Sequence, residues 1–415
     1  MEILAISLAF PPLAYPRSIQ VARLLKHTDA ATALFCADEP GARLDPSIEP
    51  HAESRLKACI RIPVPSGRLS DRILHKFARG VWNRRNLVPD GYRKWRPLVV
   101  ESAVNYVTQN RFEPNVLVTF AQPFTDHLIG LDLKKLLGLP WLAHFSDPWA
   151  DNPFTPFDAV TRKQNLKLER TVAEGADALV FTSRETADLF FGKYPAELRR
   201  KAYVLPQCYD ATQFTSPGAP SVGPITVRYL GNFYGRRSPL PLIEGLIELY
   251  QKDPEIIADV RFELIGPGDQ NQVKALAASL PAECVSVLPS VSYEESLALM
   301  TSADGLMIID APAETSVFLP SKLIDYIGAG RPVFGITPKG TAAELIGKLG
   351  GSVADPALPR DVSAGLRKFI RCLRDRRNER PDRPWGDACV REQFTAAKVS
   401  ADFLQMLENL TVKSK

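Results

Sequence analysis

The stretch Val317–Thr337, with the sequence VFLPSKLIDYIGAGRPVFGIT, combines a basic and an acidic side chain with a predicted helix start. Ser321 follows Pro320 at this start, where a serine oxygen can accept an otherwise unpaired backbone N–H. The N–H groups of a helix N-terminus also attract anions such as phosphate. Lys322 lies at this helix start, where its ammonium group could bind a phosphate. Asp325 lies one turn further on, where its carboxylate could bind hydroxyl groups. The pair suits a sugar nucleotide, although an ordinary loop–helix–strand crossover explains these residues equally well.

A second group of polar and aromatic residues follows the predicted strand Trp141–Phe145, in the sequence HFSDPWADNPF. His144, Asp147 and Trp149 belong to it. Such groups at the carboxyl edge of a parallel sheet commonly bind hydroxylated ligands. Because alternate strand positions face opposite sides, only one of His144 and Asp147 is expected to reach the ligand. The first loop, PPLAYPRS, contains no GxGxxG motif, but Arg17 in it could supply positive charge.

These loops need a framework of strands and helices to position them. Short apolar runs alternate with segments of helical periodicity, which predicts an α/β protein with two doubly wound parallel sheets. Strands are expected at 2–8, 31–36, 115–120, 141–145, 178–182, 202–205, 226–230, 260–265, 285–288, 306–309 and 332–337. Helices are expected at 18–25, 92–109, 161–175, 239–250, 271–279, 294–301, 322–329 and 391–410, and the segment 121–140 is expected to form a loop and an amphipathic helix.

The length of 415 residues favours two domains. The segment Pro206–Pro224 is rich in proline and glycine and is the best candidate for the linker between them. We therefore predict one domain over residues 1–206 and a second over 207–390. The final helix, within 391–415, is expected to pack back on the first domain.

The composition excludes several classes of protein. No run approaches about 18 apolar residues, so no transmembrane helix is expected. The N-terminus is apolar but contains Glu2 and no basic start, which favours a buried strand over a signal peptide. The six cysteines include no CxxC pair, which argues against a zinc site or a disulfide framework and fits a reducing cytosol. We expect a cytoplasmic protein.

Residues 55–96 form a basic stretch, with twelve Lys or Arg against two acidic residues, a net charge of +10. Aromatic residues, among them Trp82, Tyr92 and Trp95, are interspersed. The mixture suits an anionic membrane surface, such as the inner face of the cell membrane, or an anionic lipid-linked substrate. The alternative is that these Lys and Arg side chains form an ordinary solvent-exposed surface without a binding role. No nucleic-acid-binding module accompanies the charge, so nucleic acid is not expected as a partner.

Six fragments now point to a known class when taken in order. They are LAHFSDPWADN at 142–152, VLPQCYDATQF at 204–214, YLGNFYGRRSP at 229–239, LIGPGD at 264–269, VSYEESLALMTSADGLMII at 291–309 and FLPSKLIDYIGAGRPV at 318–333. Over nearly its whole length the chain resembles the retaining glycosyltransferases of the GT-B fold, in the group 1 or family 4-like class. The resemblance implies two Rossmann-like domains facing a central cleft. It also implies a nucleotide-sugar donor on the C-terminal domain and a glycan or lipid-linked acceptor on the N-terminal one.

The resemblance assigns donor-binding roles to residues of the second domain. The loop that would meet the donor diphosphate contains Gly231, Asn232, Arg236 and Arg237. Arginine suits this role because its planar fork binds phosphate oxygens in pairs and keeps its charge. Gly266 would pass close to the nucleotide base.

The helix start at Ser321 and Lys322 would complete the donor site. Members of the class usually carry two glutamates eight positions apart around this helix. Asp325 replaces the second and can still hold the ribose hydroxyls, whereas Val317 replaces the first and cannot contact the sugar. Glu314, three residues earlier, could substitute for it.

On the acceptor side, Asp147 stands close to where the class places a polar residue near the reacting sugar. His144 and Glu314 are the other catalytic candidates, and Arg17 and Trp149 would complete the acceptor site. The chain has no Asp-x-Asp motif, so neither a divalent metal nor another cofactor is expected. Arginine and lysine side chains and helix N-termini would neutralise the leaving diphosphate instead.

The sequence thus predicts a glycosyltransferase that moves a sugar from a nucleotide diphosphate to a hydroxyl with retention, in cell-surface polysaccharide or glycolipid synthesis. Two alternatives remain open. Val317 in place of glutamate motivates a GT-B-like protein that binds a nucleotide or glycan without transfer. A sugar-nucleotide epimerase would need further acid/base carboxylates around the sugar, which the sequence does not identify.

Overall fold

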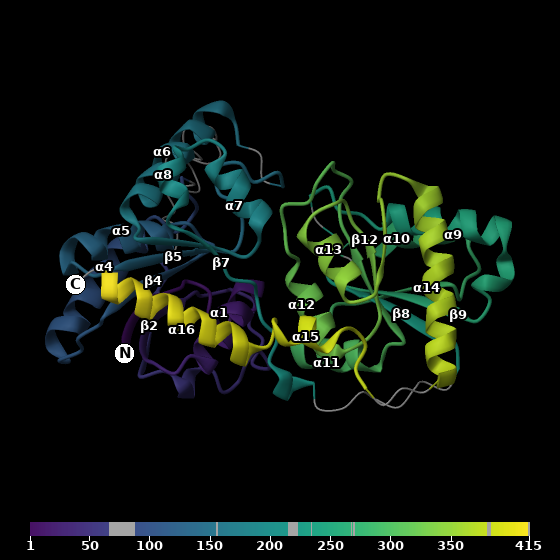
Figure 1. Cartoon of the computed structure of the whole chain (residues 1–415), viewed down its shortest axis with the longest axis horizontal. Helices are drawn as coiled ribbons and strands as arrows, with labels where there is room; N and C mark the ends of the chain where they lie inside the picture. Colours follow the sequence, from purple (N-terminus) through teal and green to yellow (C-terminus); the bar gives the residue numbers. More distant parts are fainter. Residues whose placement is uncertain are drawn as a thin grey trace. The chain divides into compact units, whose positions relative to one another are not determined.

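The computed structural model describes residues 1–65, 88–154, 157–214, 223–233, 235–266, 268, 270–379 and 383–413. The chain forms two compact units. The first consists of Met1–Pro206 with Val399–Lys415, and the second of Gln207–Lys398. Each unit contains one parallel sheet with helices packed against it (Figure 1).

The first unit has a seven-stranded sheet in the order β3-β2-β1-β4-β5-β6-β7. All its strand pairs are parallel, and the order reverses direction between β1 and β4. The strands are β1 (Glu2–Ile6), β2 (Ala31–Asp38), β3 (Ala58–Pro63), β4 (Val116–Ala121), β5 (Trp141–Phe145), β6 (Ala178–Phe181) and β7 (Ala202–Val204). The helices are α1 (Pro16–His27), η1 (Glu53–Arg55), α4 (Arg96–Gln109), α5 (Thr125–Leu137), α6 (Ala159–Gly175), α7 (Arg184–Phe191) and α8 (Ala196–Arg199).

The helix α16 (Ala396–Lys413) returns to the first unit from Val399 onward. The hydroxyl of Ser400 donates to the carbonyl of Leu24 at 3.0 Å, and the ring of Phe403 lies 6.3 Å from that of Phe120. A short helix, α15 (Ala388–Glu392), precedes it. The predicted single helix over 391–410 is therefore two helices.

The second unit has a six-stranded parallel sheet in the order β10-β9-β8-β11-β12-β13, which reverses between β8 and β11. Its strands are β8 (Ile225–Leu230), β9 (Val260–Ile265), β10 (Val285–Leu288), β11 (Gly305–Ile309), β12 (Val333–Ile336) and β13 (Ser352–Ala354). Its helices are η2 (Ala211–Gln213), α9 (Leu240–Lys252), η3 (Pro254–Ile256), α10 (Gln270–Leu276), η4 (Ala277–Ser279), α11 (Tyr293–Ser302), α12 (Ser321–Ala329), α13 (Thr341–Lys348), α14 (Pro359–Glu379) and α15.

Glycines allow two close approaches around these sheets. At Gly130 in α5, a Cβ would lie 2.6 Å from the Trp141 ring, so only glycine lets α5 pack on β5 at this point. Gly330 ends α12 in a left-handed conformation with φ of 64°, which glycine adopts without strain. The chain then turns directly into β12.

The start of α12 differs from the prediction in one respect. Pro320 occupies the N-cap, and Ser321 is the first helical residue, with no side-chain cap hydrogen bond. The amide of Leu323 bonds to the carbonyl of Pro320 at 3.0 Å. The first N–H groups of a helix have no acceptor within it, so this end keeps donors for a ligand.

The structure describes part of the basic stretch, and the predicted membrane role of 55–96 stays a prediction. Trp95 is fully buried and donates through Nε1 to the carbonyl of Ile62, and the Tyr92 hydroxyl donates to Glu39. The ring of Trp95 is therefore not exposed to a membrane, whereas Tyr92 is half-buried with its hydroxyl engaged by Glu39. Three of the cations pair with acids: Lys57 with Glu2, Arg61 with Glu53, and Arg96 with Asp132.

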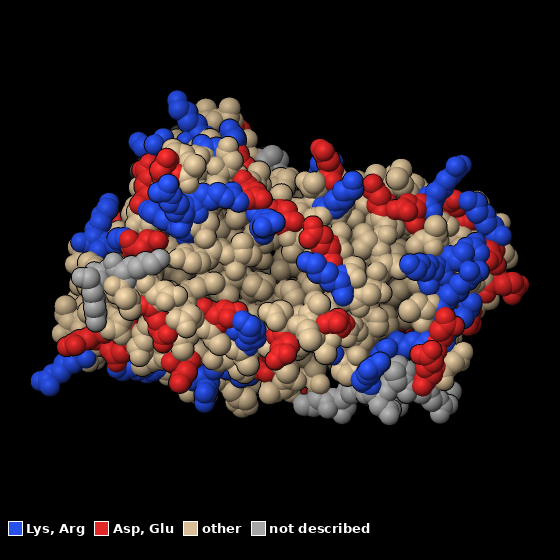
Figure 2. Space-filling model, viewed as in Figure 1, with Lys and Arg blue, Asp and Glu red and all other residues tan. Residues whose placement is uncertain are grey.

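Residues 66–87, with Trp82 and much of the predicted charge, lie outside the described part of the chain. On the face in view, Lys and Arg side chains are interspersed with Asp and Glu over the described surface of each unit (Figure 2). A search of the described helices for one long and apolar enough to cross a membrane finds none.

Candidate functional site

The C-terminal ends of the central strands of the second unit bring most of the predicted donor residues together. In doubly wound sheets, ligands bind outside these ends, at the point where the strand order reverses. In this unit that point lies between β8 and β11. Gly231 follows β8, Asp310 follows β11, Thr337 follows β12, and α12 begins nearby with Ser321.

Lys322 is the central cation of this region. Its Nζ lies 2.9 Å from the hydroxyl of Tyr229 and 4.0 Å from the centre of the same ring. A Cβ at Gly231 would lie 2.6 Å from Nζ, and Gly231 has φ of 131°. Glycine is therefore favoured here by the backbone turn, and a Cβ would also make the lysine side chain move.

Burial lowers the pKa of Lys322. The loss of water around its ammonium, together with the positive charge of Arg237, lowers its pKa to about 7, and the Asp310 carboxylate opposes this shift. An ammonium in this state gains more from a nearby anion than an exposed lysine does, because the anion replaces hydration that the protein has already removed. The region is thus prepared for a negative ligand.

Arg237, predicted to bind diphosphate, forms an ion pair within the protein. Its Nε donates to Asp310 Oδ1 at 2.8 Å and its Nη2 lies 2.7 Å from the same oxygen. Both side chains are less than a tenth exposed. The hydroxyl of Thr337 donates to the other oxygen of Asp310 at 3.0 Å. Arg237 is therefore part of the framework of the site, whereas Arg236 beside it is exposed.

The remaining predicted donor residues line the same edge of the sheet. Asp325 lies one turn into α12 and is about 8% exposed. Asn232 and Gly266 follow β8 and β9, and a Cβ at Gly268 would lie 2.5 Å from Asn232 Oδ1. Glu314 is exposed in the loop between β11 and α12.

In the first unit, three predicted acceptor-side residues lie together. Arg17, in the first turn of α1, donates from Nη2 to the His144 carbonyl at 3.0 Å, and the same nitrogen lies 2.9 Å from His144 Nδ1. Burial lowers the pKa of Arg17 to about 10, against the opposing effect of the carboxylates of Asp147 and Asp126. Both His144 and Asp147 therefore interact with Arg17, and which of the two reaches a ligand stays a prediction.

Asp126, which was not predicted as a site residue, links the two central strands of the first sheet. Its Oδ2 accepts from the backbone N–H of Leu8 at 2.8 Å, after β1, while Asp126 itself lies in the first turn of α5, after β4. Burial raises its pKa well above the usual carboxyl range. Asp126 Oδ1, Arg17 Nε and His127 Nε2 are buried without hydrogen-bond partners among the described residues. The only sequence signal was an acidic residue just after an apolar strand.

Trp149 does not belong to this cluster, and its surroundings give no support to the predicted role at the acceptor. Its ring is 1% exposed and stacks on Phe124 with ring centres 4.6 Å apart. Its Nε1 donates to Asn165 at 2.8 Å. The side chain is buried in the core, and its polar nitrogen is already hydrogen-bonded.

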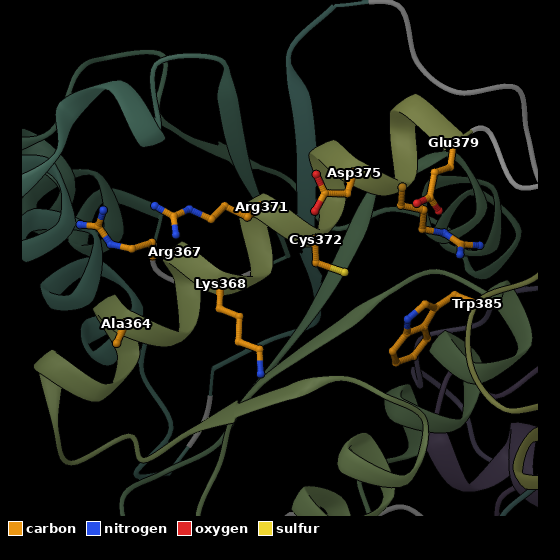
Figure 3. Close-up of a pocket in the computed structure, with 9 residues that line it drawn as sticks. Ala364, Arg367, Lys368, Arg371, Cys372, Asp375, Glu379 and Trp385 are labelled. Atoms are coloured by element: carbon orange, nitrogen blue, oxygen red, sulfur yellow. The ribbon is translucent and has the colours of Figure 1, made fainter.

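A separate hollow of about 540 Å³ lies along α14, with Trp385 at its far side (Figure 3). Arg367 and Arg371 extend away from Trp385 in this view. Arginines of α14 anchor the helix to neighbouring loops: Arg367 to Asp253, Arg374 to Asp259 and Arg377 to Asp304. None of the predicted site residues lines this hollow. The three arginines named above form ion pairs that stabilise the fold of the second unit.

Solved structures match the chain over its whole length. HepE from Anabaena, in complex with UDP and glucose, is 15% identical with a TM-score of 0.65, and the match covers 99% of this chain and 100% of HepE. Sucrose-phosphate synthase from Thermosynechococcus elongatus is 15% identical with a TM-score of 0.64, covering 100% of each chain. The lipopolysaccharide outer core galactosyltransferase WaaB is 13% identical with a TM-score of 0.59, covering 100% of this chain and 99% of WaaB.

Neither the protein-family models nor the curated protein sequences yield a match to this chain. At these low identities the structural likeness establishes the fold and nothing finer. The two parallel-sheet, Rossmann-like units and their match to these structures confirm the predicted architecture. The chain has the GT-B fold.

Proposed function

We propose that the protein is a glycosyltransferase that moves a sugar from a nucleoside diphosphate to a hydroxyl group, with retention of the anomeric configuration. The observation that carries this proposal is the Lys322 ammonium, held by Tyr229 beside the start of α12 at the strand-order reversal of the second unit. A partly dehydrated cation next to helix N–H groups is suited to the diphosphate of a nucleotide sugar.

Structures of similar fold support the choice of donor. HepE has been solved with UDP and with UDP-glucose, and a structure described as trehalose-6-phosphate from E. coli has UDP-2-fluoro glucose bound. We assign the diphosphate to Lys322, the α12 N-terminus and Arg236. Asp325 is assigned to the ribose hydroxyls, where a carboxylate can accept two hydrogen bonds.

In the proposed reaction, the bond between the sugar C1 and the diphosphate oxygen breaks and a bond from C1 to the acceptor oxygen forms. The departing diphosphate takes the proton of the acceptor hydroxyl. The protein positions both substrates and stabilises the charge that develops on the diphosphate through Lys322, Arg236 and the helix N–H groups. The acceptor, a glycan or lipid-linked saccharide, is assigned to the first unit near Arg17, His144 and Asp147.

Thermal unfolding with a panel of nucleotides and nucleotide sugars tests the proposal. A ligand at 100 times its dissociation constant adds about 2.7 kcal/mol to the free energy of unfolding. For a unit of this size, that corresponds to a rise of roughly 5–10 °C in Tm. Lys322→Met should reduce the rise and Lys348→Met, an exposed lysine on α13, should not. The proposal fails if no member of the panel raises Tm.

A protein that binds nucleotide sugar without transferring the sugar is the second candidate. Val317 favours it, since an apolar side chain replaces the glutamate usual in the class that the sequence resembles. The two candidates differ in turnover. Saturating nucleotide sugar that raises Tm but is neither hydrolysed nor transferred to any of a set of glycan acceptors would favour the binding protein.

A further inference from the structure

His144 is held from one side by a single cation. Arg17 is about 7% exposed, and its Nη2 lies 2.9 Å from His144 Nδ1 and 3.0 Å from the His144 carbonyl oxygen. Its Nη1 donates to Gln20 at 2.9 Å, and its guanidinium lies 5.5 Å from the Phe120 ring centre. Contacts on both terminal nitrogens fix the plane of the guanidinium, so the fork meets His144 in one orientation.

This contact decides which nitrogen of the imidazole carries the proton. A guanidinium has only donors, so a hydrogen bond between Arg17 Nη2 and His144 Nδ1 requires Nδ1 to accept. The neutral ring must then carry its proton on Nε2. Protonation of Nδ1 would set two N–H groups and two positive charges against each other in a buried place.

We propose that Arg17 is a positioning residue that holds His144 as the neutral Nε2–H tautomer, so that His144 donates a hydrogen bond to a hydroxyl or ring oxygen of a bound sugar. The identity of the ligand rests on the proposed function, whereas the tautomer rests on the structure of the first unit alone. None of the described residues hydrogen-bonds Nε2, so this donor remains for a ligand.

The charges that surround the ring agree with a neutral imidazole. Burial lowers the pKa of His144 well below its usual value, and Arg17 and His127 lower it further. Arg17 itself stays charged at neutral pH, because its pKa is about 10 and the carboxylates of Asp147 and Asp126 stabilise the guanidinium. His127 is also buried, with Nδ1 2.7 Å from the Thr119 hydroxyl.

The assignment excludes one role for His144. A ring that accepts at Nδ1 and carries a proton on Nε2 has no free lone pair with which to remove a proton from an acceptor hydroxyl. His144 therefore contributes recognition and orientation of the sugar, and the acceptor proton leaves by another route.

Imidazole ¹⁵N chemical shifts of the whole protein, labelled at its five histidines, test the tautomer without any substrate. His144→Gln identifies the His144 signals. We expect an unprotonated Nδ1 and a protonated Nε2 throughout pH 5.5–8.5. A wild-type spectrum with the proton on Nδ1, or one that titrates near pH 6.5, overturns the proposal.

Arg17 variants test the cause. In Arg17→Met we expect a mixture of the two neutral tautomers, while burial still keeps the ring unprotonated in this pH range. Arg17→Lys, which keeps one donor, should restore much of the Nε2–H form. If Arg17→Met folds with the tautomer of His144 unchanged, Arg17 has no positioning role. Should Arg17→Met fail to fold, the wild-type and Arg17→Lys spectra still decide.

The donor role of Nε2 is tested by turnover of whichever nucleotide sugar raises Tm. The side-chain amide of glutamine can place a donor near the position of Nε2, so His144→Gln should stay within about tenfold of the wild type in kcat/KM. His144→Ala should lose roughly tenfold more. Equal losses in both variants would contradict a donor role. Absence of turnover with the tautomer intact would refute the proposed function and leave the Arg17–His144 assignment standing.

Discussion

Nucleotide-sugar binding should weaken as pH rises above 7, because Lys322 loses its proton. Burial lowers its pKa to about 7, helped by Arg237. A bound diphosphate stabilises the ammonium and raises the pKa of Lys322 in the complex. At any pH where Lys322 of the free protein is neutral, the complex holds one proton more than the free protein. Ligand binding then takes up that proton from solution.

The size of the effect follows from the pKa. With a free value of about 7 and a bound value well above 8.5, the dissociation constant grows with the neutral fraction and rises roughly 30-fold from pH 6 to pH 8.5. This equals about 2 kcal/mol of binding free energy. At pH 8, binding should take up about 0.9 proton for each ligand bound.

Isothermal titration with UDP-glucose, or with whichever nucleotide sugar of the panel binds, measures both quantities. The phosphates of such a donor are esterified and do not titrate in this range, so the change reports on the protein. Titrations at pH 8 in buffers of different ionisation enthalpy give the number of protons. Lys322→Met should bind weakly with a flat pH profile, and Lys348→Met should behave as the wild type.

The same pKa shift has a consequence for stability. The unfolded chain holds the Lys322 proton up to about pH 10.4, whereas the folded chain releases it near pH 7, so the free energy of unfolding rises with pH between these values. Lys322→Met should thus raise Tm at pH 7 while it weakens binding. A dissociation constant that stays level from pH 6 to 8.5, with no proton uptake, would refute the reasoning.

Three further variants probe the same region. Arg237→Ala leaves the Asp310 carboxylate buried without its cation and should cost roughly 3–5 kcal/mol of unfolding free energy. Denaturant unfolding measures this cost, and the double variant Arg237→Met/Asp310→Leu should recover most of it. An unchanged unfolding midpoint for Arg237→Ala would contradict the buried pair. Arg236→Ala, at an exposed position, should weaken nucleotide-sugar binding with Tm unchanged without ligand; equal affinity would remove Arg236 from the donor site. Gly231→Ala should lower Tm and weaken nucleotide-sugar binding, because Gly231 has φ of 131° and its Cβ would meet Lys322 Nζ. The cost in stability should be roughly 1–3 kcal/mol. Normal affinity in this variant would show that the lysine moves aside freely.

Where apolar runs are bounded by turn residues, the sequence predicted the elements well. The strands β5, β9 and β10 begin and end where the apolar pattern does, because each run is flanked by Pro, Gly or polar residues. The strand β3 was missed because it is an edge strand whose residues are only partly buried, so it carries no continuous apolar run. The long helix α14 was missed because it contains many charged residues. Its apolar residues are few and form one buried stripe, which is hard to recognise in the sequence.

The site could be predicted in part. The place of Lys322 at a helix start follows from local sequence, and so does the turn at Gly231. Its partners do not, because Tyr229 lies 93 residues from Lys322 in the chain and Asp310 lies 73 residues from Arg237. Only the folded sheet brings such residues together.

Orientation was the second limit, since sequence does not tell whether a loop aromatic faces a ligand or the core. Trp149 follows a strand end, as a ligand-binding residue would, yet it stacks on Phe124. Charge partners were the third limit. Arg237 resembles a phosphate ligand in sequence, and only its buried ion pair with Asp310 identifies it as part of the framework.

The central claim is that this chain moves a sugar from a nucleoside diphosphate with retention, and the anomeric proton of the donor reports on it most directly. Proton NMR of the protein with each nucleotide sugar in turn should show one donor signal decay, with the sugar first appearing in the same anomeric configuration. The decay should slow in Lys322→Met and persist in Lys348→Met. Release of the opposite anomer would contradict retention, and stable signals for every donor and acceptor offered would contradict transfer itself.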